Sequence, residues 1–471
     1  MRHLRLAAET CRFLPPARVS DACATLTLQA LVFEPLLRWT DGGRVVPALF
    51  SDWQMEDGGR RWDFRIRDGA RFHDGAAVDA AHVLATIEGI LGSLDMFGMK
   101  WSYSRYLRDA RITAPTRTTI RVENPEPFAD ILDVFAEFTL VREDAAGAPI
   151  LGTGPYRVES FIPETSAELR RVADTPGPER ITFLAIQGAE ARIAALMEGR
   201  ADCAMQLERE AADAREAATL EWHRGLNGLS AMHYLNAFEG AFTHPAARLA
   251  INLAVDRNAI MQELFHGLGV LSASVVSPVH MGFRAAGVAP IPHDPARAQR
   301  LFEEARIGGP LLLRTPRTLP EKALEVTQAV AADLARCGVA TRIEIEEDRP
   351  EYARQVGRKE IGDVAIFDSS PRSTFRVLDD KVSSANRAVW WQGFHDDETQ
   401  RLIQAANRTI GDDAREVAYG AVLRRLNAAP PWLYLFHPIE VFAHRPGAGR
   451  FAAHGVSGGQ WHFGVIGPDV L

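Results

Sequence analysis

Cysteine is scarce in this 471-residue sequence. Its four cysteines include no C-x-x-C pair, and they stand at Cys11, Cys23, Cys203 and Cys337. So few and so scattered, they form neither a disulfide framework nor a zinc knuckle. A single bridge between Cys11 and Cys23 stays open on spacing alone.

Long apolar runs are also missing. No window reaches the roughly 18 apolar residues that a membrane-spanning helix needs. The basic start Met1–Leu6 leads directly into polar Glu9 and Thr10, so no signal peptide is recognised. Either an export signal is absent from this form of the chain or the protein stays in the cytoplasm, and the sequence leaves both open.

Neither sign of charge dominates any segment, although the formal net charge is -8. We therefore expect no nucleic-acid partner.

The motifs H-E-x-x-H and G-x-x-x-x-G-K-[ST] are absent, which gives no support to a zinc hydrolase or an ATPase. One G-x-S-x-G match, Gly455–Gly459, lacks the acid and then histidine that a hydrolase needs downstream. We expect no enzyme activity, no cofactor and no bound metal.

The chain is too long for one core, and the length predicts two or three domains. Its composition, 46% hydrophobic and 24% charged, is ordinary for a soluble globular protein. Alternating patterns predict strands at Trp62–Ile66 and Thr118–Val122, and helical spacing predicts a helix over Val78–Leu91 with Asp79 near its start. Glycines and a proline in Gly152–Val158 predict a tight turn that enters a strand.

Helical and extended patterns alternate in the second half of the chain. Helices are expected at Ala189–Met197, Pro245–Phe265, Asp294–Ala305 and Pro320–Cys337, and strands at Thr341–Glu346 and Asp363–Phe367. Asp294 and Pro295 are a helix-start signal, and Gly338 is a helix-end signal. This alternation predicts α/β lobes.

Several motifs occur in the order and spacing of one known family. They are Phe33–Leu37 followed by Pro47–Leu49 and Trp53, then Gly58–Gly75, Gly152–Val158, Leu235–Asn236 with Ala254–Arg257, Asp294–Ala305, and Gly393–Phe394 before Asp397. On these blocks the chain resembles extracellular solute-binding protein family 5, the dipeptide-, oligopeptide- and nickel-binding proteins of ABC transporters.

The resemblance implies an α/β, two-lobe periplasmic-binding-protein-like fold of type II, in the large cluster with an extra subdomain. The two lobes would be hinged around a ligand cleft. We expect lobe I to span residues 1–234, with an inserted subdomain at about 46–150. Lobe II would span 235–438, and residues 439–471 would return to lobe I.

The resemblance also implies a function without chemistry. The protein would bind a small polar ligand, a peptide or peptide-like compound, and deliver it to ABC permease subunits from the periplasm or cell surface, acting as a monomer. A nickel, metal-chelate or opine-type ligand is the alternative within the family. A cytoplasmic ligand sensor is the alternative outside it.

Some candidate ligand contacts lie where this sequence departs from the family pattern. Peptide-binding relatives carry an aspartate in a late aromatic-acidic block, but this sequence has Asp368–Ser373 there. Asp368 would hold a ligand ammonium, or Arg372 would clamp a carboxylate, beside the hydroxyl of Ser370. A solvent-exposed loop arginine is the alternative for Arg372.

Other candidates are aromatic or polar. Trp101 lies near a tryptophan of the nickel-binding relatives, with core packing as the alternative. Arg105 would replace an arginine that they use, with an arginine on a helix surface as the alternative. Of Trp390 and Trp391, expected on a strand, at most one can enter the cleft, because adjacent strand residues face opposite sides. Asn236 would contact ligand or be satisfied locally.

Overall fold

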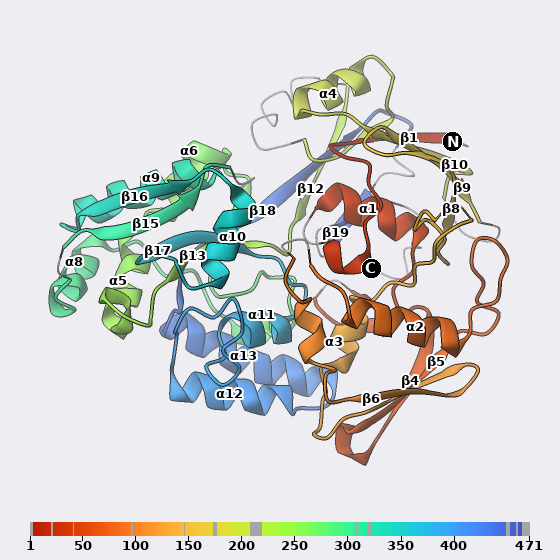
Figure 1. Cartoon of the computed structure of the whole chain (residues 1–471). Coiled ribbons are helices and arrows are strands. Elements are labelled where there is room, and N and C mark those ends of the chain that lie inside the picture. Colours follow the sequence, from red (N-terminus) through yellow and green to blue (C-terminus); the bar gives the residue numbers. More distant parts are fainter. Residues whose placement is uncertain are drawn as a thin grey trace. The chain divides into compact units, whose positions relative to one another are not determined.

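The computed structural model describes residues 3–19, 22–40, 42–95, 98–145, 147–172, 177–207, 219–307, 309–318, 322–448, 453–457 and 460–463. The chain forms two compact units (Figure 1). Unit 1 comprises Met1–Gly225 and Glu440–Leu471, and unit 2 comprises Leu226–Ile439. The sequence places the corresponding boundaries after residues 234 and 438.

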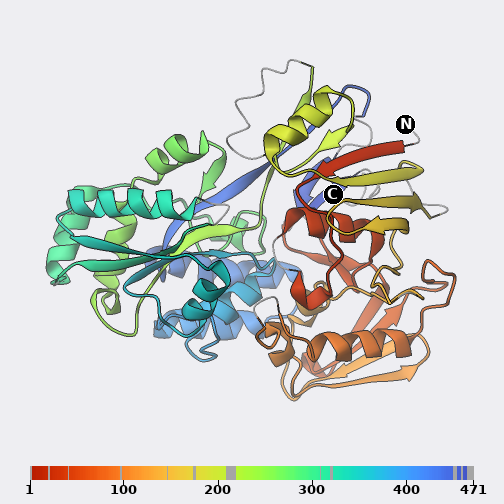
Figure 2. The ribbon, with the colours of Figure 1, turned by 45° about the horizontal axis from the view of Figure 1, so that its top comes forward.

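Unit 1 contains a mixed sheet built around the N-terminal strand. Its strand order is β8 (Tyr156–Ile162), β9 (Ser166–Arg171), β10 (Arg180–Ala185), β1 (His3–Ala8), β11 (Cys203–Ala204) and the end of β18 (Trp432–His444). Strand β1 runs parallel to both β10 and β11, and the other pairs are antiparallel. Figure 2 shows red β1 alongside these olive strands. Helix α1 (Cys23–Val32) shares an apolar core with this sheet, and α4 (Ala189–Met197) precedes β11.

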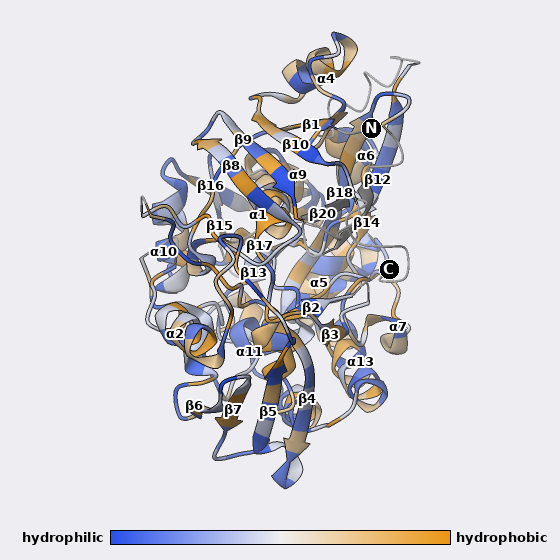
Figure 3. Ribbon diagram, turned by 90° about the vertical axis from the view of Figure 1, so that its right-hand side faces the viewer, coloured by the Kyte–Doolittle hydropathy of each residue, from blue (hydrophilic) through white to orange (hydrophobic). Residues whose placement is uncertain are grey.

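A second sheet in unit 1 lies within the residue range expected for an inserted subdomain. Its order is β4 (Phe50–Glu56), β5 (Arg61–Ile66), β7 (Thr119–Glu123) and β6 (Arg111–Thr116), packed with α2 (Ala80–Leu91) and α3 (Ile131–Phe135), while β2 (Leu37–Trp39) pairs with β3 (Val45–Pro47). Buried and more exposed residues alternate along β5, visible as bands of hydropathy in Figure 3. Phe64 lies in the core, with its ring centroid 5.1 Å from Phe50 and 4.9 Å from Phe135.

The strands predicted at Trp62–Ile66 and Thr118–Val122 are confirmed as β5 and β7. The helix predicted over Val78–Leu91 is also confirmed, beginning at Ala80 after an Asp79 cap. The Asp79 carboxylate accepts hydrogen bonds from the amides of Ala81 and His82 at 3.1 and 3.2 Å. It thereby satisfies two amide groups that have no partner within the helix.

The turn predicted at Gly152–Val158 leads into β8, and its glycines are required by a close backbone approach. The amide of Gly154 donates to the carbonyl of Val32, at the end of α1, at 2.9 Å. A Cβ atom on Gly154 would lie 2.6 Å from the Val32 carbonyl carbon, and one on Gly152 would lie 2.3 Å from the Val32 oxygen. No other residue type fits this contact without moving the backbone.

Unit 2 is built on a sheet of order β16 (Thr341–Glu346), β15 (Leu311–Pro316), β17 (Val364–Ser369), β13 (Ser230–Leu235) and the first part of β18, with β14 (Gly269–Leu271) also paired to β18. Strand β15 runs parallel to β16 and β17. Around it lie α5 (Pro245–Ala254), α6 (Arg257–Phe265), α8 (Pro295–Glu304), α9 (Ala323–Arg336) and α10 (Arg349–Gly357). A further group contains α7 (Phe283–Ala286), α11 (Thr374–Lys381), α12 (Asp397–Asn407) and α13 (Asp412–Ala428), the last three blue in Figure 1.

One predicted helix is wrong in unit 2. The stretch Pro245–Phe265 forms two helices, because Val255 is extended and Asp256 starts a new helix. The Asp256 carboxylate accepts from the amide of Ala259 at 3.0 Å, and its own amide donates to Asp333 at 2.8 Å. A capping carboxylate inside an apolar-periodic segment therefore overrides the continuous pattern.

All four cysteines are buried free thiols, so Cys11 and Cys23 form no bridge. Burial raises the pKa of Cys11 to about 12 and also raises the pKa values of Cys203 and Cys337. These side chains pack as small apolar groups.

Two histidines are enclosed in unit 2. Nε2 of His233 on β13 lies 3.3 Å from the Thr327 hydroxyl, and Nδ1 of His437 on β18 lies 3.1 Å from the Ser230 hydroxyl. Burial lowers the pKa of each imidazole to about 3, so both are neutral at neutral pH.

We expect Gly154→Ala to lower the free energy of unfolding by about 1–3 kcal/mol, because the new methyl group overlaps the Val32 backbone. Gly89→Ala is the matched control, since its Cβ would meet nothing within 4 Å and helix α2 favours alanine there. Urea unfolding should show Gly89→Ala unchanged or slightly stabilised. Equal effects of the two substitutions would refute the packing argument.

We expect stability to fall as pH drops below 6.5. The ordinary pKa of 6.5 for His233 falls to about 3 in the folded state, so between these values the unfolded chain binds the extra proton. Each such histidine then lowers the free energy of unfolding by up to about 1.4 kcal/mol for each pH unit below 6.5. Urea midpoints from pH 7.5 to 5.0 should decline less steeply for His233→Gln than for wild type. An equally steep decline in His233→Gln and in wild type would contradict this argument.

Candidate ligand-binding site

The predicted residues Asp368, Ser370 and Arg372 lie where β17 ends and the chain turns into α11. Strand β17 runs parallel to β15, so this segment leaves the carboxyl end of a parallel pair. Ligands of α/β proteins commonly bind beyond such strand ends. The fold thus places these three residues where binding groups are commonly found.

Buried hydrogen bonds hold this segment in place. Nε2 of His280 lies 2.8 Å from the Pro371 carbonyl and must donate, because a carbonyl only accepts. Burial lowers the pKa of His280, so Nδ1 is free of a proton and accepts from the Ser277 hydroxyl at 3.0 Å. The Thr374 hydroxyl donates to the Met281 carbonyl at 2.6 Å. The backbone around Arg372 is therefore fixed from both sides.

Lys381, at the end of α11, is a buried cation beside this segment. Its Nζ donates to the Asp368 carbonyl at 3.1 Å and to the Tyr234 hydroxyl at 3.2 Å. The ammonium lies 5.7, 5.5 and 5.6 Å from the ring centroids of Tyr234, Phe367 and Trp390, within cation–π range. Burial raises the pKa of Tyr234 well above its ordinary value, so its hydroxyl keeps its proton.

The sequence analysis missed Lys381, although a signal was present. It lies one helical turn after buried Val377, on the apolar side of its helix. Lysine at such a position is buried only when partners compensate its charge. The partners come from distant strands and could not be read from local pattern.

Asp368 has a cationic neighbour on its own chain. Nη2 of Arg349, in the first turn of α10, lies 3.4 Å from Oδ2 of Asp368. The side chain of Asp368 is 13% exposed, against 35% for Arg349. This carboxylate is therefore already partly neutralised, and Arg349 is a second residue that the sequence analysis missed.

Arg372, unlike Arg349, pairs with no carboxylate of the described residues. Its side chain is half-buried, yet within the described residues it makes no hydrogen bond, ion pair or ring contact. The hydroxyl of half-buried Ser370 likewise has no partner among those residues. A guanidinium that is held by a fixed backbone and has no partner among those residues is suited to an external carboxylate.

The paired tryptophans lie in a turn, which corrects the strand expected for them. Trp391 is buried, and its Nε1 donates to the Phe394 carbonyl at 2.7 Å. Trp390 is half-buried, with its ring 5.2 Å from that of Phe367. Only Trp390 joins the cluster around Lys381.

Asn236 is satisfied by local backbone. Its Nδ2 donates to the Gly362 carbonyl at 2.9 Å, and its Oδ1 accepts from the Phe238 amide at 3.1 Å. The bond to Gly362 joins the segment after β13 to the segment before β17, in keeping with the local structural role given as its alternative.

Trp101 and Arg105 belong to unit 1, on either end of a single turn of 3-10 helix. Trp101 is 7% exposed and packs against Tyr103 and Phe138, with ring centroids at 4.5 and 5.3 Å. Nη2 of Arg105 donates to the Tyr106 hydroxyl at 2.8 Å. Trp101 therefore belongs to the apolar core that is shared with β5 and α2.

The model of bacterial extracellular solute-binding proteins, family 5 Middle, matches residues 44–378. This chain belongs to that family. The predicted family is thereby confirmed, and its name describes binding proteins rather than enzymes.

The glutathione-binding protein GsiB of Escherichia coli O1:K1 is 25% identical over 343 residues, which are 67% of this chain and 64% of GsiB. The match thus spans less than two thirds of that relative.

Solved structures share the fold. The DppA protein of Helicobacter pylori in complex with peptide STSA superposes with a TM-score of 0.77 at 20% identity, covering 97% of this chain and 96% of that one. NikA of Brucella suis in complex with Fe(III)-EDTA gives 0.79 at 19% identity, covering 98% and 99%. These matches confirm the predicted α/β periplasmic-binding-protein-like class. Within the described ranges, no helix is both long and apolar enough to cross a bilayer.

We expect Lys381→Met to lower the free energy of unfolding by about 1–3 kcal/mol, because Tyr234 and the Asp368 carbonyl lose a charged donor in a buried setting. Tyr234→Phe removes only one of these bonds and should cost about 1 kcal/mol. Urea denaturation of the two single variants and the double variant measures their coupling. Strictly additive effects would show that the two groups do not interact.

Proposed function

We propose that this protein is the solute-binding component of an ABC importer. It binds a small polar ligand, a peptide or peptide-like compound, and delivers it unchanged to a membrane permease. Family membership supports this class of function. The residues at the end of β17 indicate the chemical class of the ligand.

The observation that carries the ligand class is the guanidinium of Arg372, which has no partner in the part of the chain that the structure describes. Peptides, glutathione and EDTA, which appear in the names of the relatives, all carry carboxylates. A planar guanidinium binds a carboxylate through two parallel hydrogen bonds. Arg372 is therefore assigned the terminal carboxylate of the ligand, with the Ser370 hydroxyl as an additional donor.

The remaining groups fit a ligand that also has an ammonium and an apolar part. Asp368 retains acceptor capacity beside Arg349, since a carboxylate has about four acceptor positions. Trp390 presents a half-buried ring, the kind of wall that small-ligand sites use. Together they favour a zwitterionic peptide over a ligand that carries only negative charge.

Partners and location follow from the same proposal. The protein acts as a monomer with its permease at the outer face of the membrane, in the periplasm or at the cell surface, and binds no nucleic acid. Expression from the native upstream region followed by cell fractionation tests the location. Recovery in the cytoplasm would favour a ligand sensor instead.

We expect Arg372→Gln to weaken binding of a carboxylate ligand by roughly 10- to 100-fold, because the variant loses a charge-assisted bidentate contact. The measurement is calorimetric titration of the purified chain with glutathione and with a panel of tripeptides. Native mass spectrometry of protein from its own host selects the first ligands to test. Ligand recovered after incubation should be chemically unchanged.

Arg401→Gln is the matched control, because Arg401 is 65% exposed and pairs with Glu398 on α12. It should bind as the wild type does. The C-terminal amide of the best peptide should bind wild type weakly and lose nothing further in Arg372→Gln. Equal loss of acid and amide in that variant would remove the carboxylate assignment while leaving the importer function intact.

A further inference from the structure

Three potential metal ligands from distant parts of the chain meet in unit 1. Glu221 and His223 lie on β12 (Glu221–Leu226), and His444 is the last residue of β18, which pairs with β12. Residues two apart on a strand point to the same side, so Glu221 and His223 share a face. One oxygen of Glu221 and one nitrogen of each histidine all lie within 4.8 Å of one another.

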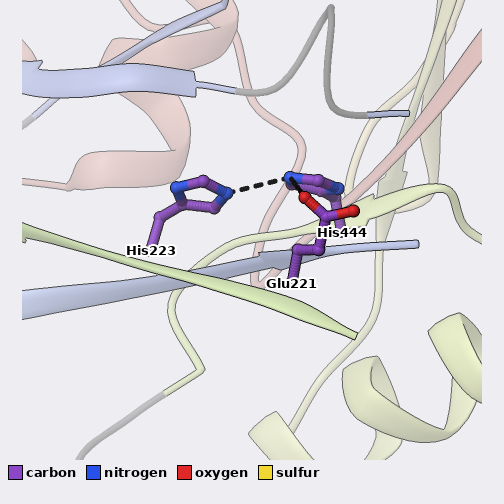
Figure 4. A group of neighbouring side chains, drawn as sticks. All are labelled: Glu221, His223 and His444. Carbon is purple, nitrogen blue, oxygen red and sulfur yellow. Dashed lines mark hydrogen bonds and ion pairs between the residues drawn. The ribbon is translucent and has the colours of Figure 1, made fainter. Parts of the chain in front are cut away.

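The two imidazoles converge through the same ring atom. Nε2 of His223 lies 2.8 Å from Nε2 of His444, and Oε2 of Glu221 lies 3.6 Å from the latter (Figure 4). The two rings are nearly parallel, with centroids 4.9 Å apart. In Figure 4 the Glu221 carboxylate points toward the His444 ring.

His444 is oriented for ligation by its other nitrogen. Nδ1 lies 3.0 Å from the Arg445 carbonyl and donates to it, because the carbonyl can only accept. In the neutral ring this leaves the lone pair on Nε2, directed at His223 and Glu221. A backbone carbonyl in this role is the usual outer support of a metal-binding histidine. The side chain of His444 is 1% exposed, so its orientation is fixed by packing.

Without a metal, the short contact between the imidazoles requires a proton between the two Nε2 atoms. A tetrahedral ion bound at about 2.0–2.1 Å would place two nitrogens about 3.3 Å apart. The rings would need to separate by about 0.5 Å, a movement that half-exposed His223 can supply. The Glu221 side chain is 57% exposed, so its carboxylate can also move to meet the ion.

We propose that Glu221, His223 and His444 form a binding site for a divalent transition metal, with Zn²⁺, Ni²⁺ or Cu²⁺ as the candidates. Imidazole nitrogens with one carboxylate suit these ions and disfavour Ca²⁺ and Mg²⁺, which take oxygen ligands. Cys203 lies opposite His444 on β11, but it is not among the three residues whose ligating atoms all lie within 4.8 Å of one another.

The proposed site is composed of unit 1 residues alone, whereas the segment that follows β17 belongs to unit 2. It lies on the two strands through which the chain enters and leaves unit 2. A bound ion would fasten β12 to β18 through side chains in addition to their backbone pairing.

The test is titration of the chelator-treated full chain with ZnCl2, and separately with NiCl2 and CuCl2, followed by calorimetry. We expect one equivalent to bind to wild type and binding to weaken by about tenfold or more in His223→Ala. His395→Ala is the matched control, because His395 pairs with Asp397 at 3.1 Å without a second imidazole. It should bind as wild type does, as should Arg372→Gln.

Glu221→Gln changes an exposed side chain and provides the decisive variant if His223→Ala fails to fold. It should also weaken metal binding, while circular dichroism of the metal-free protein stays unchanged. Co²⁺ added to wild type should give the intense visible absorption of a low-coordinate nitrogen and oxygen site. Absence of binding in wild type, or equal binding by wild type and both site variants, would overturn the proposal.

Discussion

Both units depend on the backbone ladder of one strand. Strand β18 pairs with β11 in unit 1 and with β13 and β14 in unit 2, so each sheet would have an unpaired inner edge without it. Unpaired backbone groups in a core are costly, because each loses its bonds to water without gaining others. The strand therefore has to be buried and apolar through most of its length, as its composition reflects. Polar residues on it, such as His437 and His444, need specific partners.

Local signals in the sequence predicted much of the secondary structure. Helix α2, with its Asp79 cap, and helix α8, with Asp294 and Pro295, begin as predicted, because capping and proline act within a few residues. The break at Asp256 was missed because the same capping chemistry occurs inside an apolar repeat. The family motif at Gly152 and Gly154 was recognised as a turn. Its cause, contact with the end of α1, needed coordinates.

Side-chain partnerships in the candidate site could be predicted only in part. The residue types at Asp368, Ser370 and Arg372 pointed to ligand binding, but the sequence could not tell which charges are already paired. Arg349 on α10 pairs with Asp368 on β17, whereas the Arg372 side chain has no such partner within the described residues. The contact between His223 and His444 could not be predicted either, because these residues are 221 positions apart in the sequence. Such long-range pairs leave no trace in local periodicity.

The buried thiols have a practical consequence. Since all four native cysteines are enclosed and the pKa of Cys11 is raised to about 12, reagents such as maleimides will find little thiolate on the native protein. A cysteine introduced at exposed Met197 in unit 1 or at exposed Val417 in unit 2 would be modified selectively. Donor and acceptor dyes at these two positions would report the distance between the units in solution, with the four native cysteines left in place.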